Sequence, residues 1–150
     1  MISVTTEINW CMAHRLVRGY EGPCNNIHGH NYKALVTITG EVDDKGMIID
    51  FKEMKNILNV WIISSLDHTL LIDTEDPLKE KITEVFENSM DISFLSKPTT
   101  AEHLCAYIAE CLQIELGIRY GDESQLKVMQ VTVFETEKNS ATWTNTKGVS

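Results

Sequence analysis

Three histidines and a cysteine lie close together early in the chain and could bind a metal ion or transfer protons. The segment "CNNIHGHNYK", residues 24–33, contains one thiol and the pair His28-Gly-His30. Residues i and i+2 of an extended chain point to the same face, so both imidazoles can reach one ion. If the segment that ends near His14 pairs antiparallel with this one, His14 lies beside them. The spacing therefore predicts a metal site.

The role of Cys24 has two interpretations at this point. Three neutral imidazoles leave a fourth position open, which is the arrangement of a catalytic zinc ion. Cysteine is also a good zinc ligand, and a closed site of Cys24 with the three histidines would be structural.

Two further candidates for a site lie downstream. Asp67 and His68 follow the expected end of a helix; an aspartate beside an imidazole raises its pKa and suits proton transfer, although a solvated turn has the same residues. Glu135 stands near the end of an expected strand, "VFET", where solvent exposure would also explain it. Cys11, Cys105 and Cys111 are interpreted as small core residues.

The first half of the chain predicts a hairpin followed by a helix. Apolar residues alternate along residues 2–13 and 31–42, as in half-buried strands. From Asp50 onward the apolar spacing becomes helical, and this helix is expected to end just before Leu66. Residues 71–97 are interpreted as a polar connection with one short helix.

The second half predicts another helix and another hairpin. Thr99 and Glu102 are expected to form a capping box at the start of a helix that Gly117 and Gly121 close. The runs "LKVMQVTVFET" and "SATWTNT" then alternate on either side of the turn "EKN". The order indicates an α+β fold with four strands and two helices on one face, and its edge strands favour association with further copies.

Composition restricts the partners. The chain has 150 residues, enough for one domain, and a formal net charge of −9. An acidic surface disfavours binding to nucleic acid and to anionic lipid. No apolar run reaches the roughly 18 residues of a membrane span, and the N-terminus has no signal-peptide pattern. The four cysteines include no CxxC pair. We therefore expect a cytoplasmic protein with reduced thiols.

Several motifs resemble one family when they are taken in order. "AHRL", "CNNIHGHNYK", "LDH", "PTTAEHLC" and "VFET", between residues 13 and 136, resemble the 6-pyruvoyl-tetrahydropterin synthase and 6-carboxytetrahydropterin synthase family. The resemblance implies a single domain over residues 1–150, with an insertion at about 71–97. It also implies the tunnelling fold, a four-stranded antiparallel sheet in the order ββααββ, whose sheets join into a barrel of three subunits. Two trimers would stack into a hexamer with active sites between subunits.

The resemblance also implies roles for the residues of the histidine segment. His14, His28 and His30 would bind Zn²⁺, and Cys24 would be a catalytic thiol. The substrate would be 7,8-dihydroneopterin triphosphate, converted by this lyase to 6-carboxy-5,6,7,8-tetrahydropterin, triphosphate and acetaldehyde in queuosine biosynthesis. The C-x3-HGH spacing favours this branch. The alternatives are a 6-pyruvoyl-tetrahydropterin synthase and a non-catalytic, zinc-stabilised interaction domain.

The remaining motifs complete the implied site. Asp67 and His68 would transfer protons, Glu135 would accept paired hydrogen bonds from the pterin ring, and Thr100 would help to bind that ring. Three basic residues near the histidine segment are candidates for contacting the triphosphate: Arg15, Arg18 and Lys33. No motif assigns this role to any of them. The acidic residues of the 71–97 insertion are unusual beside such a substrate.

Overall fold

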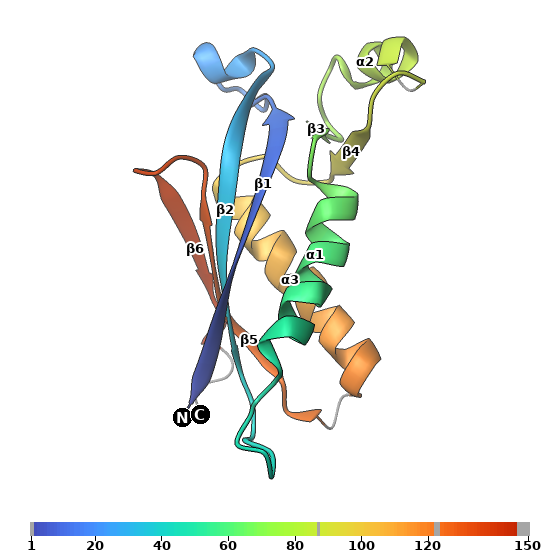
Figure 1. Cartoon of the computed structure of the whole chain (residues 1–150). Helices are drawn as coiled ribbons and strands as arrows, with labels where there is room; N and C mark the ends of the chain where they lie inside the picture. The colour runs from blue at the N-terminus through green and yellow to red at the C-terminus, as the bar shows by residue number, and fades with distance from the viewer. Residues whose placement is uncertain (1, 87, 122–123, 147–150) are drawn as a thin grey trace.

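Two long antiparallel strands form the centre of the fold. The structure is a computed structural model that describes residues 2–86, 88–121 and 124–146 (Figure 1). Strand β1 (Ser3–His14) pairs with β2 (His28–Thr39) along its whole length, so that Ser3 faces Thr39 and His14 faces His28. Even-numbered residues of both strands face the core, as the alternating pattern predicted.

Within the described residues, these strands belong to a mixed sheet of six strands, in the order β4-β3-β1-β2-β5-β6. The second hairpin, β5 (Lys127–Phe134) and β6 (Ser140–Thr144), is antiparallel and adds to the edge of β2. This hairpin was predicted.

The expected sheet of four strands with the order ββααββ is wrong in one region. The segment taken as a polar connection contains most of β3 (Thr69–Asp73), which runs parallel to β1, and all of β4 (Ile92–Leu95), which runs parallel to β3. All five residues of β3 are buried, so this strand has no alternating pattern to reveal it. Between the two lies the expected short helix, α2 (Lys79–Phe86).

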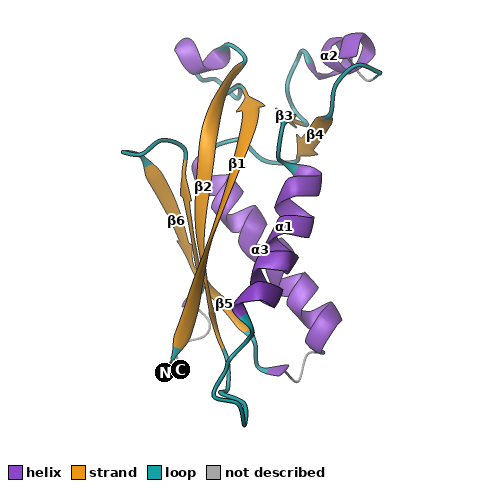
Figure 2. Ribbon diagram, viewed as in Figure 1, coloured by secondary structure: helices purple, strands orange, loops and turns teal. Residues whose placement is uncertain are grey.

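The two long helices, α1 (Phe51–Ser65) and α3 (Ala101–Tyr120), lie on one face of the sheet (Figure 2). Asp50 is the N-cap of α1, and its side chain accepts a hydrogen bond from Lys52 N at 2.7 Å. The core is formed by apolar side chains between this face and the helices; the largest fully buried ones include Tyr32, Ile38, Met54, Leu58, Leu104 and Leu116. None of the described helices is long and apolar enough to cross a membrane.

The predicted capping box of α3 is wrong by one residue. Thr100 is the N-cap, and Thr99 instead donates a hydrogen bond from its hydroxyl to Arg15 O at 2.9 Å. The hydroxyl of Thr99 therefore bonds to the residue that follows β1 and does not cap the helix. Thr99 is thereby fixed beside the histidine segment.

Candidate active site

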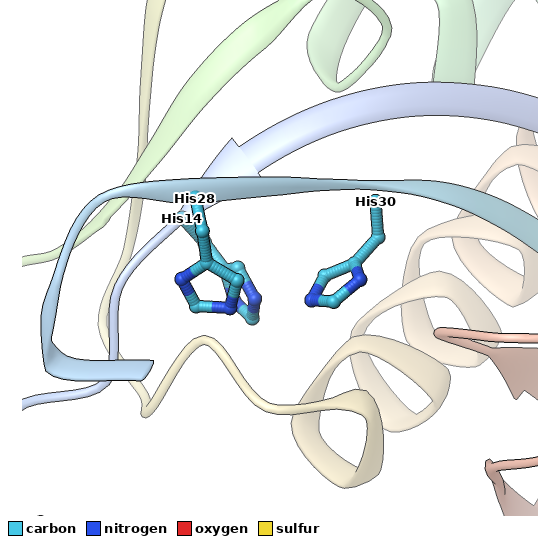
Figure 3. A group of neighbouring side chains, drawn as sticks. All are labelled: His14, His28 and His30. Atoms are coloured by element: carbon cyan, nitrogen blue, oxygen red, sulfur yellow. The ribbon is translucent and has the colours of Figure 1, made fainter. Parts of the chain in front are cut away.

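Strands β1 and β2 bring the three histidines together at one end of the sheet. His14 is the last residue of β1 and pairs with His28, the first residue of β2, while His30 follows on the same face. The three rings point away from β2 toward the segment that leads into α3 (Figure 3). One nitrogen of each lies within 4.8 Å of the others. The predicted convergence of His14, His28 and His30 is confirmed.

The hydrogen bonds of two rings use Nδ1 and leave the lone pair of Nε2 able to bind a metal ion. His14 Nδ1 lies 2.7 Å from Thr99 O, and His28 Nδ1 lies 2.8 Å from Asn26 O. A carbonyl only accepts, so each Nδ1 carries the proton and each Nε2 keeps its lone pair. Metal-binding histidines are commonly oriented in this way by a backbone carbonyl.

The ring of His30 and the burial of His14 are also consistent with a bound metal ion. His30 Nε2 is buried and has no hydrogen-bond partner among the described residues. Burial lowers the pKa of His14 against the opposing effects of Thr99 and Glu135, which keeps its imidazole neutral and able to ligate. The three-histidine group can therefore bind a metal ion.

Glu135 lies beside this group, although it is 105 residues from His30 in the chain. The pairing of β2 with β5 places it just after Phe134, opposite the start of β2. Its Oε1 atom is 3.5 Å from His14 Nε2 and 3.9 Å from His30 Nε2. Tyr32 donates a hydrogen bond from its hydroxyl to the same oxygen at 3.4 Å.

Cys24 lies in the loop between β1 and β2, in the short 3-10 helix Pro23–Asn25. Its thiol is half-buried and contacts the side chain of Tyr20, and its carbonyl accepts from Leu16 N at 2.8 Å. Among the described residues, the potential ligand group contains only histidines. This arrangement supports the open site and not the closed site with a cysteine ligand.

Arg15 and Arg18 connect this loop to the end of β3 and to the segment that follows it. Arg18 makes a two-pronged pair with the buried Asp73, at 2.6 and 2.8 Å, and Arg15 Nε lies 3.5 Å from Asp76. The acidic residues of the insertion therefore neutralise the arginines nearest to Cys24.

Asp67 and His68 contact each other as expected, but this pair lies apart from the three-histidine group. Asp67 accepts from Cys11 N at 2.9 Å and pairs with His68 Nδ1 at 3.0 Å. Burial raises the pKa of Asp67, but the hydrogen bonds from Cys11 and His68 outweigh it and lower the pKa overall. His68 takes a left-handed backbone conformation with φ of 58°, and its side chain is 79% exposed.

His68 lines a cavity of about 400 Å³ together with Cys11 and Asn31, two odd-numbered residues of β1 and β2, whose side chains lie on the face opposite the three histidines. The wall of this cavity also includes His30. Cys11 Sγ bonds to Asn31 Oδ1 at 3.1 Å on this face. The interpretation of Cys11 as a core residue is wrong because it is exposed, whereas Cys105 and Cys111 are buried as expected.

Thr100 shares a cavity of about 260 Å³ with Glu135. The cavity also has Glu102 and Asn139 in its wall, residues that the sequence did not assign to a site. Glu102 had a sufficient explanation as a helix cap, and Asn139 as part of a turn. Only the fold brings the start of α3 and the β5–β6 turn together.

Comparisons with known proteins agree with this geometry. The family model described as 6-pyruvoyl tetrahydropterin synthase matches residues 3–146. A 6-carboxy-5,6,7,8-tetrahydropterin synthase of Rickettsia typhi is 32% identical over 140 residues, which cover 91% of this chain and 96% of the relative. The enzyme of the same name from Haemophilus influenzae is 29% identical, with 91% and 94% covered.

Solved structures show the same fold. A catalytic-residue mutant of 6-pyruvoyltetrahydropterin synthase from Plasmodium vivax superimposes with a TM-score of 0.75 at 20% identity, over 96% of this chain and 97% of that one. The Caenorhabditis elegans 6-pyruvoyl tetrahydropterin synthase gives 0.65 at 25% identity, over 97% and 96%. With the histidine group at the end of β1 and β2, these matches establish that the chain belongs to the 6-pyruvoyl tetrahydropterin synthase family.

Proposed function

We propose that this protein is a 6-carboxy-5,6,7,8-tetrahydropterin synthase, a lyase that converts 7,8-dihydroneopterin triphosphate and releases triphosphate and acetaldehyde. The observation that carries the proposal is the three-histidine group beside Glu135 and the Cys24 loop. The relatives from Rickettsia typhi and Haemophilus influenzae bear this name. We further place the reaction in the cytoplasm, in queuosine biosynthesis.

We propose zinc as the metal, held by Nε2 of His14, His28 and His30. Zinc, when bound, would supply a Lewis acid. Cys24, as the thiolate, would take a proton from the substrate side chain. Glu135 orients the substrate by accepting two ring N–H groups, with Thr100 at the same cavity.

Asp67 and His68 would act as the second proton-transfer group. Asp67 holds His68 Nδ1, which leaves His68 Nε2 to give or take a proton. Because His68 lines a cavity with Cys11 and Asn31, on the face opposite the three histidines, we propose that the pair of one subunit serves the histidine group of another.

Free sheet edges support such an assembly. Among the described residues, β3 covers β1 only along Met12–His14, and β6 has a neighbour on one side only. Exposed strand edges pair readily with further strands. We propose that the exposed part of β1 joins β6 of another subunit, that three copies close a barrel, and that two trimers form a hexamer.

The test is an incubation of zinc-loaded protein with 7,8-dihydroneopterin triphosphate, followed by mass spectrometry of the pterins and an acetaldehyde assay. Carboxytetrahydropterin with acetaldehyde is the expected result. A pyruvoyl product without acetaldehyde would transfer the chain to the other branch, whose name the Plasmodium vivax and Caenorhabditis elegans proteins bear. Unchanged substrate would refute the proposal.

A further inference from the structure

The hydroxyl of Tyr32 lies between the metal ligands and the carboxylate of Glu135. It is 3.3 Å from His14 Nε2 and 3.4 Å from Glu135 Oε1. The ring is 1% exposed and stacks on Trp10, with centroids 5.2 Å apart and planes at 11°. Since the ring is fixed by this packing, the hydroxyl stays between its two neighbours.

Tyr32 has one proton and two acceptors. A tyrosine hydroxyl has an ordinary pKa of about 10 and therefore carries its proton at neutral pH. His14 donates from Nδ1 to Thr99 O, which leaves the lone pair of Nε2 as one acceptor. The carboxylate of Glu135 is the other.

A metal ion bound to His14 removes one of these acceptors, because the lone pair of Nε2 then points at the ion. The O–H group of Tyr32 is left with Glu135 alone. A fixed hydrogen bond to Oε1 would restrict the rotation of the carboxylate. A carboxylate that is already oriented binds the paired N–H groups of a pterin ring at a lower entropic cost.

We propose that Tyr32 couples metal binding to binding of the pterin ring, by committing its hydroxyl to Glu135 when His14 ligates the metal. The inference rests on the proposed function, because it takes Glu135 as the ring anchor. Tyr32 is a positioning residue: it acts through Glu135 and does not itself contact the substrate.

The coupling has an expected size and a required symmetry. Couplings between two binding sites typically change affinity by about 5- to 150-fold. One hydrogen bond is at stake, so we expect about tenfold, at the lower end of that range. Because the two binding equilibria are thermodynamically linked, binding of the pterin ring must raise the affinity for the metal by the same factor.

The test uses unsubstituted pterin as the probe, which carries the ring but none of the side-chain hydroxyls of the substrate. Its dissociation constant is measured by calorimetry on chelator-treated and on zinc-loaded full-length protein. We expect zinc to tighten binding about tenfold in the wild type and less than about twofold in Tyr32→Phe, with zinc stoichiometry unchanged. The matched control is Tyr107→Phe, which removes the hydroxyl of another tyrosine, packed against Trp61 between α1 and α3; it should behave as the wild type.

Two results would overturn the inference. An equal effect of zinc in the wild type and in Tyr32→Phe would mean that the charge of the ion alone strengthens ring binding. Weaker ring binding with zinc in the wild type would mean that Glu135 turns to the metal. Zinc affinity in the wild type with and without pterin, measured by chelator competition, is a reciprocal test that needs no variant; equal affinities would also overturn the coupling.

Failure of the proposed function gives a different pattern. Binding of pterin that is absent, or unchanged in Glu135→Gln, would refute the ring anchor and the coupling, whereas unchanged 7,8-dihydroneopterin triphosphate would refute the proposed lyase activity. Ring binding that depends on Glu135, together with undiminished coupling in Tyr32→Phe, would refute only the role of Tyr32.

Discussion

Replacing Arg18 by alanine tests whether Asp73, the last residue of β3, stabilises the loop that carries Cys24. Arg18 binds Asp73 with Nε to Oδ2 at 2.6 Å and Nη2 to Oδ1 at 2.8 Å. Asp73 is 1% exposed, and its remaining hydrogen bond comes from Glu75 N at 2.9 Å. The substitution therefore leaves a buried carboxylate with one donor among the residues that the structure describes.

The expected loss follows from these contacts. Hydrogen bonds to charged groups contribute about 1.5–3 kcal/mol each. The side chain of Arg18 is 30% exposed, so water can replace part of the interaction once the guanidinium is removed. We expect the free energy of unfolding to fall by about 2–3 kcal/mol, which corresponds to roughly 5–10 °C in Tm for a chain of this length.

The assay is urea unfolding at fixed protein concentration, repeated across pH. Burial raises the pKa of Asp73, but the hydrogen bonds from Arg18 and Glu75 outweigh it and lower the pKa overall. The contribution of the pair is therefore complete above the ordinary Asp pKa of about 3.9 and is lost as the pH falls through the folded-state pKa. The matched control is Arg119→Ala, which removes an exposed i,i+4 pair in α3 and should cost less than about 0.5 kcal/mol.

Two outcomes would refute this reasoning. One is a loss in Arg18→Ala no larger than that of the Arg119→Ala control. The other is a difference between wild type and Arg18→Ala that grows as the pH falls, because protonation of Asp73 must remove its attraction to Arg18 and shrink the difference.

Substitutions in the site separate its roles. Cys24→Ala should keep zinc, measured by elemental analysis, and lose at least about 100-fold in kcat, as expected when a proton-transfer group is removed; loss of the metal would instead make the thiol a ligand. His28→Ala should lose most of the zinc in the same assay, since one of three ligands is gone. Glu135→Gln should raise KM about tenfold or more, because one charge-assisted acceptor is lost. Asp67→Asn should lower kcat about 10- to 100-fold with little change in KM, because His68 loses its orienting partner; initial rates against substrate concentration distinguish these two variants.

The histidine group could be predicted because the information is local. The H-x-H spacing puts His28 and His30 on one face, and a hairpin of two alternating strands brings His14 to the same end. The observed register, with His14 opposite His28, needs only this pairing. The identity and order of the motifs then predicted the family.

Long-range contacts account for what could not be predicted. Strand β3 is defined by its neighbours β1 and β4, and its fully buried sequence has no period of two. Thr99 caps nothing because its hydroxyl bonds to Arg15, 84 residues away in the chain. The separation of the Asp67–His68 pair from the three histidines depends on which face of the sheet each element presents, and no local pattern specifies this.

The charges around the site bear on how a triphosphate could bind. Arg18 is paired with Asp73, Arg15 lies against Asp76, and the ammonium of Lys33 lies 4.4 Å from the centroid of the Phe134 ring. Lys33 is also an odd-numbered residue of β2, on the face opposite the histidines. A triphosphate that bound Arg15 or Arg18 of one chain alone would have to take the arginine from a buried carboxylate, at a cost close to that expected for Arg18→Ala. Positive charge supplied by a neighbouring subunit carries no such cost. The acidic residues at the end of β3 and after it thus favour a substrate site completed between subunits.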